Sequence, residues 1–343
     1  MVVALLFGSF ALLLILRVPI GISLGMSSLI TIFASGVVQP TYLAQGLVTG
    51  ADSFSLMAVP FFVLAGELMA TGGISRRLLN IADAFLGRKY GGLALVTVVA
   101  CMFFAAISGS GPATVAAIGG LTIPSMLKQG YDRPFAGAIS AAAGSIGVII
   151  PPSIPMVMYC VATGVSVGAM FMGGVIPGIL IGVSLCVYSS LYSKKHKYIN
   201  AEAAPFSWGN VGRSLVDGIW ALLVPVIILG GIYGGIFTPT EAAAVAVAYG
   251  LIVGLFVYRD LKAKDLYRIF GSAALTTATI MVILGTATTF GRILTLERIP
   301  TMIADFFESV AKGPIMLMIL INILLLIVGC FMETNAAIIL PAP

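Results

Sequence analysis

Charged residues are scarce in this chain. Of 343 residues, 9% are Asp, Glu, Lys or Arg and 59% are hydrophobic, whereas soluble domains carry about 25% charged and about 45–50% apolar residues. A chain with so few polar side chains cannot cover a water-exposed globule. At least seven apolar runs approach the roughly 20 residues that a membrane-spanning helix needs. The sequence therefore predicts a polytopic membrane protein.

Cysteine and histidine are also rare. The four cysteines lie in apolar segments without a CxxC spacing, and the single histidine, His196, lies in a basic loop, so neither a disulfide framework, a metal cluster nor histidine catalysis is supported. The sequence has no P-loop, no HExxH, no nucleophile elbow and no dinucleotide-binding glycine motif. We expect a protein that is not an enzyme. The basic residues are scattered between apolar runs, so the net charge of +5 gives no support for nucleic-acid binding.

The apolar runs predict an all-α fold. The expected spans lie near 2–16, 18–36, 54–72, 135–162, 168–192, 214–236, 239–257 and 269–290. Two further apolar regions, 91–127 and 313–343, are interrupted in the middle. If 91–127 is a re-entrant hairpin, 15 of the 18 Lys and Arg residues share one side of the membrane. The positive-inside rule makes that side cytoplasmic.

The two interrupted regions are expected to form an inverted repeat. Residues 81–85, followed by Gly91, resemble residues 303–307, followed by Gly313, at a constant offset of 222. Under the topology above, the two hairpins enter the membrane from opposite sides, as in many secondary transporters. The expected organisation is an N-terminal repeat over 1–200, a cytoplasmic linker over 201–213, and a C-terminal repeat over 214–343 whose hairpin starts near 313.

The middle of the first hairpin is rich in helix breakers. Residues 107–114 read Ile-Ser-Gly-Ser-Gly-Pro-Ala-Thr, and their freed main-chain groups need partners in protein or around a polar cavity. Hydroxyl and carbonyl oxygens suit an alkali cation, and the helix that begins near Thr114 turns a positive N-terminus toward a carboxylate. The alternative is a packing kink whose hydroxyls bond to local carbonyls.

Two more segments interrupt apolar runs. Residues 143–155 contain three prolines and two glycines, which indicates a discontinuous helix with an unwound centre; a simple turn between two short helices is the alternative. Glu333, in Met332-Glu333-Thr334-Asn335, is an expensive intramembrane carboxylate and a candidate to hold a cation or a proton.

Two other carboxylates have local interpretations. Thr238-Pro239-Thr240-Glu241 predicts a capping box at a helix start. Glu67 is expected near the cytoplasmic end of its helix, or paired with a neighbouring subunit.

In combination these motifs resemble the large membrane subunit of the tripartite ATP-independent periplasmic (TRAP) transporters. The resemblance covers essentially the whole chain. The stretches that carry it are 51–56, 60–67, 108–114, 151–155, 171–174 with Pro177-Gly178, and 235–242.

The resemblance implies a bacterial inner-membrane permease that couples sodium entry to uptake of a small organic anion by an elevator motion. It also implies two partners, a small four-helix membrane subunit and a periplasmic solute-binding protein. A stand-alone carboxylate carrier of the related inverted-repeat type, which needs no binding protein, is the alternative.

The family pattern also implies the site residues. Carried over residue by residue, the implied sodium ligands are Ser108, Ser110, Gly144, Ser145, Glu333 and Thr334. The implied substrate contacts are Thr114, Pro152 and Asn335. Family members continue beyond the second hairpin tip, so a chain that ends at Pro343 is expected to be C-terminally truncated.

Overall fold

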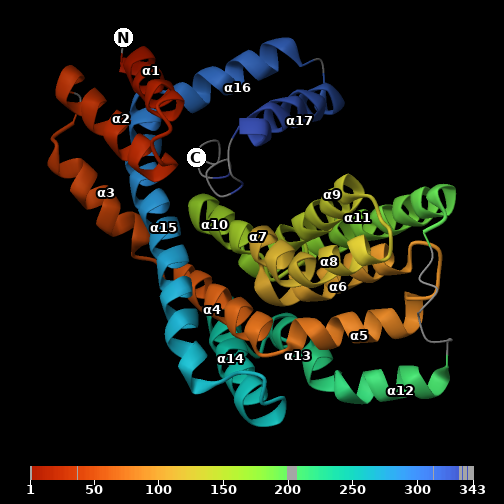
Figure 1. Cartoon of the computed structure of the whole chain (residues 1–343). Coiled ribbons are helices and arrows are strands. Elements are labelled where there is room, and N and C mark those ends of the chain that lie inside the picture. Colours follow the sequence, from red (N-terminus) through yellow and green to blue (C-terminus); the bar gives the residue numbers. More distant parts are fainter. Residues whose placement is uncertain are drawn as a thin grey trace. The chain divides into compact units, whose positions relative to one another are not determined.

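The computed structural model describes residues 2–36, 38–198, 207–311 and 313–331, together with Thr334 and Ile338. Every regular element in these residues is a helix, which confirms the predicted all-α class (Figure 1). In the same residues, four helices are long and apolar enough to cross a membrane: Phe54–Thr71, Val167–His196, Pro239–Val257 and Ala263–Leu296. A fifth candidate is the pair Trp208–Asp217 and Ile219–Tyr233, which is bent by 59°.

The chain divides into two compact units. The first comprises the described parts of Met1–Leu56, Met158–Gly164 and Leu275–Pro343, and the second comprises those of Met57–Val157 and Val165–Ala274. Two helices, α10 (Ile154–Thr163) and α15 (Ala263–Leu296), contribute to both units.

The first unit is built on the second half of α15. Its other helices are α1 (Val2–Ile15), α2 (Ile20–Ser35), α3 (Thr41–Ala51), α16 (Ile299–Val310) and α17 (Pro314–Phe331). The 3-10 turn η1 (Phe54–Met57) also belongs to it, except for its last residue.

Small residues allow close packing in the first unit. A Cβ atom added to Gly25 of α2 would lie 3.0 Å from Cγ2 of Thr286, and one added to Gly50 of α3 would lie 3.1 Å from Cα of Gly285. Such close approach is typical of helices that pack in lipid, where van der Waals contact replaces the hydrophobic drive.

The second unit holds both broken segments of the N-terminal half. Its helices are α4 (Ala58–Thr71), α5 (Ile74–Leu86), α6 (Gly92–Ser108), α7 (Gly111–Thr114), the π-helix η2 (Val115–Gly119), α8 (Gly120–Lys128), α9 (Arg133–Gly144), the 3-10 turn η3 (Ser145–Val148), α11 (Val167–His196), α12 (Trp208–Asp217), α13 (Ile219–Tyr233), α14 (Pro239–Ile252) and the π-helix η4 (Val253–Val257).

The predicted hairpin 91–127 is present as a helical hairpin. The chain reverses after α6, and η2 and α8 return along it; α6 also packs against α9 and α11 (Figure 1). The predicted broken helix 135–162 is present as α9, η3 and α10. The direction in which the hairpin enters the membrane, and its inverted counterpart in the second half, stay predictions.

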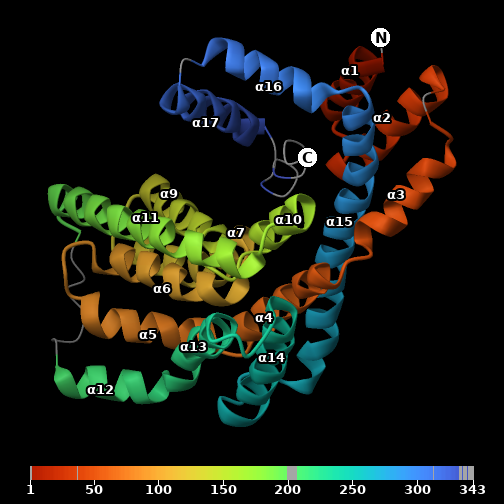
Figure 2. The same ribbon diagram turned by 180° about the vertical axis from the view of Figure 1, so that it is seen from behind.

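Two amphipathic helices, α5 and α12, lie wholly or mostly outside the predicted spans. Helix α5 buries Ile74, Leu78, Ile81 and Ala82 along one face, and it packs against α12 (Figure 2). Helix α12 includes residues 208–213 of the expected linker; residues 201–206 lie outside the described residues. The predicted span 214–236 therefore starts with the end of α12 and bends into α13.

The predicted capping box starts α14. The main-chain N–H of Glu241 donates to Oγ1 of Thr238 at 3.3 Å, and the N–H of Thr238 donates to Oε2 of Glu241 at 2.8 Å. These reciprocal bonds satisfy two main-chain donors that a helix start leaves without partners.

Candidate functional site

The tip of the hairpin is formed by a glycine and a serine between two helices. Gly109 ends α6 in the left-handed region, at φ +63°, a conformation that glycine adopts without steric cost. Ser110 then begins α7 in an extended conformation, and its hydroxyl accepts from the N–H of Ala113 at 3.4 Å. Pro112 fits the first turn of α7, where no N–H is needed.

Three oxygen-bearing residues converge inside this tip. The hydroxyls of Ser108 and Thr114 are 2.9 Å apart, and the Thr114 hydroxyl donates to the carbonyl of Ser110 at 2.8 Å. Ser108 and Thr114 are buried, at 1% and 0% exposure. The hydroxyls thus bond to one another and to a local carbonyl, as in a packing kink, and they supply the oxygen types that an alkali cation would bind.

The Ser153 side chain bridges the two parts of the broken helix. After η3, the hydroxyl of Ser153 donates to the carbonyl of Val148 at 2.7 Å and accepts from the N–H of Met156 at 3.4 Å. The Pro151–Pro152 peptide bond is cis, and Pro152 and Ser153 are buried. These bonds join the end of η3 to the first turn of α10.

The two breaks meet within the second unit. The N–H of Ile154 donates to the carbonyl of Gly109 at 3.1 Å, and a Cβ atom added to Gly109 would lie 2.8 Å from the carbonyl oxygen of Pro152. A Cβ atom added to Gly147 would lie 2.7 Å from the carbonyl oxygen of Ser110. Glycines at both positions therefore allow main chain to lie directly on main chain. We call this region the tip junction, comprising residues 108–114 and 144–154.

All six predicted N-terminal site residues lie in the tip junction: Ser108, Ser110, Thr114, Gly144, Ser145 and Pro152. Gly111 approaches the carbonyl oxygen of Gly144, with an added Cβ at 3.4 Å. Ser145 differs, because its hydroxyl donates to the carbonyl of Ala142 at 2.7 Å and its side chain is exposed. Of the C-terminal candidates, Glu333 and Asn335 lie outside the described residues, and Thr334 is helical and exposed.

A cavity of about 660 Å³ lies beside the returning arm of the hairpin. Its polar lining includes Glu67 of α4 with Arg268 and Ser272 of α15, and the Ser272 hydroxyl donates to Oε1 of Glu67 at 3.1 Å. The hairpin side is lined by apolar residues, most of them small: Ala113, Ala116, Ala117, Gly120 and Leu121. The sequence placed Glu67 near a helix end, but it gave no sign of Ser272 as its partner.

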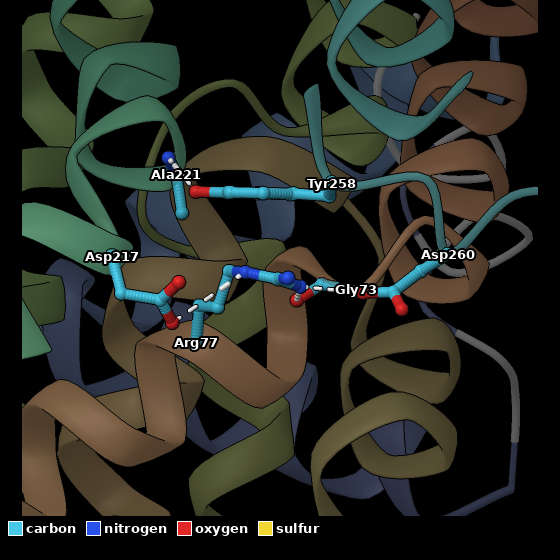
Figure 3. Close-up of polar contacts among 6 residues, drawn as sticks. All are labelled: Gly73, Arg77, Asp217, Ala221, Tyr258 and Asp260. Carbon is cyan, nitrogen blue, oxygen red and sulfur yellow. Dashed lines mark hydrogen bonds and ion pairs between the residues drawn. The ribbon is translucent and has the colours of Figure 1, made fainter. Parts of the chain in front are cut away.

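A second charged cluster is centred on Arg77 of α5. Figure 3 shows its side chain between Asp217 and Asp260. Its guanidinium forms ion pairs with both carboxylates, at nitrogen–oxygen distances of 3.6 Å to Asp217 and 2.5 Å to Asp260. The guanidinium carbon lies 3.6 Å from the centre of the Tyr258 ring, and the Tyr258 hydroxyl accepts from the N–H of Ala221 at 3.2 Å. Burial raises the pKa of Tyr258 although Arg77 opposes that shift. The cluster joins α5, the end of α12 and the turn before α15.

Comparison with known proteins places these features in a family. The model of the tripartite ATP-independent periplasmic transporter DctM component matches residues 7–343. The chain is 52% identical over 338 residues to the isethionate TRAP transporter permease protein DctMQ of Oleidesulfovibrio alaskensis, which covers 98% of this chain and 53% of that protein. The chain thus spans about half the length of that relative.

Two further relatives are covered more fully. The C4-dicarboxylate TRAP transporter large permease protein DctM of Vibrio cholerae is 42% identical over 100% of this chain and 80% of its own length. The sialic acid TRAP transporter large permease protein SiaM of the same species is 39% identical, over 96% of this chain and 77% of its own length. These relatives are membrane transport proteins and not enzymes. Together with the helical fold and its apolar spans, they establish that the chain belongs to the DctM component family of the tripartite ATP-independent periplasmic transporters.

Proposed function

We propose that the chain is the membrane permease subunit of a sodium-coupled importer that takes up a small organic anion with the help of a periplasmic binding protein. The tip junction is the observation that carries the proposal. Two segments about 40 residues apart, both interrupted within apolar runs, meet main chain to main chain, with the Ile154 N–H bonded to the Gly109 carbonyl. In membranes, irregular backbone of this kind is tolerated where it lines a site or lies buried in protein.

The names of the relatives support an anionic substrate. They include permeases for isethionate, C4-dicarboxylates, sialic acid and 2,3-diketo-L-gulonate. All four substrate classes carry a carboxylate or a sulfonate. Because the relative that is 52% identical is an isethionate permease, a short hydroxyalkylsulfonate is the first substrate to test, followed by a C4-dicarboxylate.

The chemistry of the tip junction supports the proposed sodium coupling. The Thr114 hydroxyl lies 2.9 Å from the Ser108 hydroxyl and 2.8 Å from the carbonyl oxygen of Ser110, and the Ser108 hydroxyl lies 3.4 Å from that carbonyl oxygen. A small cation would draw these oxygens toward itself in place of the hydrogen bonds among them. A bound cation would also offset the charge of an anion near the N-terminus of α7, so that each ligand would favour binding of the other.

The proposed partners follow from the family organisation. A tripartite transporter with a large permease needs a small membrane subunit and a solute-binding protein.

The cavity lined by Glu67, Arg268 and Ser272 begins three residues beyond Ser110, at Ala113, and extends along the hairpin arm. It therefore suits an aqueous path beside a moving hairpin, in agreement with the proposed elevator motion.

The test is uptake into liposomes that contain the natural transporter, its small subunit and externally added binding protein. We expect isethionate or C4-dicarboxylate uptake that requires an inward sodium gradient and the binding protein. Uptake at an equal rate with choline in place of sodium would overturn the coupling. Uptake at an equal rate without the binding protein would instead support a stand-alone carrier.

A further inference from the structure

Seven basic residues lie at one end of the second unit, in three chain turns. We call them the basic cluster: Arg88, Lys89, Lys128, Arg133, Lys194, Lys195 and Lys197. All seven are exposed, and none forms an ion pair with any described residue. Asp83 and Asp132 are the acidic residues described in these turns and the helix ends beside them, so the positive charge is largely uncompensated.

Tyr198 holds the three turns together. Its carbonyl accepts from the N–H of Gly91 at 2.9 Å, which fixes the turn between α5 and α6. Its hydroxyl donates to Asp132 at 2.6 Å, which fixes the turn between α8 and α9. Its N–H donates to the carbonyl of Ser193 at 3.0 Å, at the end of α11. The basic residues are therefore carried by neighbouring turns and not by separate loops.

Aromatic rings support the same end of the unit. The Tyr198 ring stacks on Tyr131, with ring centres 4.5 Å apart, and the Phe135 ring stacks on Tyr192 at 4.3 Å. His196 in turn stacks on Tyr192 at 4.1 Å. Tyrosine and lysine in this combination are typical of the level of lipid headgroups. Helix α11 has 30 residues and is about 45 Å long at about 1.5 Å per residue, so its last turns extend beyond a hydrocarbon layer of about 30 Å.

An exposed apolar stripe on α11 ends at the basic cluster. Leu180, Val183, Val187 and Leu191 recur at helical spacing and are 64%, 53%, 54% and 66% exposed. Lys194 and Lys195 follow Leu191 by three and four residues, so they continue the same helix face. Apolar side chains and adjacent cations in this order match an acyl chain and its anionic headgroup.

We propose that the basic cluster and the α11 stripe bind an anionic phospholipid of the cytoplasmic leaflet, whose phosphate lies at Lys194 and Lys195. Lysine and arginine near an anionic membrane surface each contribute about fivefold in binding. Replacing both lysines is therefore expected to weaken binding by about 30-fold. The proposal is independent of sodium coupling and of the transported substrate.

The experiment is titration of the purified transporter with phosphatidylglycerol or phosphatidylcholine, followed by native mass spectrometry. The variant Lys194→Gln/Lys195→Gln is compared with Lys262→Gln/Lys264→Gln, which removes the same charge from exposed positions beside Asp260 and Asp265. We expect preferential binding of phosphatidylglycerol, a loss of about 30-fold in the first variant, and unchanged binding in the second. Equal thermal unfolding temperatures of the two variants show that both are folded.

Three results would overturn the proposal. The first is equal binding of phosphatidylcholine, and the second is an equal loss of binding in the two variants. The third is displacement of phosphatidylglycerol by inorganic phosphate or by deacylated glycerophosphoglycerol at the same concentration as the lipid. That outcome would show that the basic cluster binds a soluble anion and that the α11 stripe does not contribute to binding.

Discussion

Replacing Gly147 by alanine would put a methyl group between the broken helix and the hairpin tip. An ideal Cβ atom there lies 2.5 Å from Oγ1 of Thr114 and 2.7 Å from the carbonyl oxygen of Ser110. The Thr114 side chain has an alternative rotamer, but the Ser110 carbonyl belongs to main chain that is already bonded to the Thr114 N–H at 3.0 Å. The tip would have to move by about 0.7 Å to reach ordinary van der Waals contact at 3.4 Å.

Overpacking of this size costs about 1–3 kcal/mol of folding free energy, which corresponds to a fall of about 1–4 °C in the unfolding temperature of a chain of this length. The matched control is Gly137→Ala in α9, where an added Cβ has nothing within 4 Å. There alanine should be neutral, or stabilising by up to about 1 kcal/mol, because glycine is a poor helix former.

The assay combines thermal unfolding of the purified transporter with sodium-dependent uptake in liposomes. We expect Gly147→Ala to lower the unfolding temperature and to raise the sodium concentration needed for half-maximal uptake by about 5- to 150-fold. Gly137→Ala should leave the sodium requirement unchanged, and it should leave the unfolding temperature unchanged or raise it by no more than about 2 °C. If Gly147→Ala behaves like Gly137→Ala in both assays, the hairpin tip does not pack on η3 and the reasoning is wrong.

Three further predictions concern single side chains. Ser108→Ala removes the hydroxyl that lies 2.9 Å from the Thr114 hydroxyl, and it should lower the free energy of unfolding by about 0.5–1.5 kcal/mol. We also expect a rise in the sodium concentration that uptake requires. A change in stability alone would assign Ser108 to packing. Asp260→Asn should destabilise the protein more than Asp217→Asn, because the Asp260 carboxylate lies 2.5 Å from the Arg77 guanidinium, whereas the more exposed Asp217 carboxylate lies 3.6 Å from it. Equal effects of the two substitutions in urea or thermal unfolding would contradict this ranking. Burial raises the pKa of Tyr131 to about 12, so the neutral form is favoured in the folded state, and folding stability is lost as pH rises from about 10, the unfolded pKa, toward 12. Tyr131→Phe should therefore reduce the difference in unfolding temperature between pH 8 and pH 11. An unchanged difference would refute this assignment.

The broken elements were predictable because their signals are local. Gly109, Gly111 and Pro112 interrupt one apolar run, and Pro151, Pro152 and Pro155 interrupt another. The capping box of Thr238 and Glu241 is likewise contained in four residues, and the structure confirms both of its bonds. Such residues determine backbone conformation wherever they occur, so the hairpin, the broken helix and the start of α14 follow from the sequence alone.

Other features depend on periodicity or on distant partners. Ile74, Leu78, Ile81 and Ala82 recur at helical spacing, but a search for long apolar runs passes over so short and polar a helix. The positive-inside count treats Arg77 like every other Lys and Arg, although Asp260, 183 residues away, is its main partner. No local pattern encodes a pair at that separation, because the fold alone brings the two side chains together.

The contact between the two breaks could be expected only in part. The sequence marks residues 108–114 and 143–155 as irregular, but it does not indicate that the Gly109 carbonyl would pair with the Ile154 N–H. The inverted repeat and the roles of Glu333 and Asn335 stay predictions.

Hydrogen–deuterium exchange of the purified transporter in sodium or choline chloride tests the central claim most directly. If the tip junction binds sodium, exchange in residues 108–114 and 144–154 should slow in sodium, while exchange in α5 and α12 stays the same. Addition of the transported anion should slow it further, because each ligand favours binding of the other. Identical exchange of the tip junction in sodium and choline would contradict the claim.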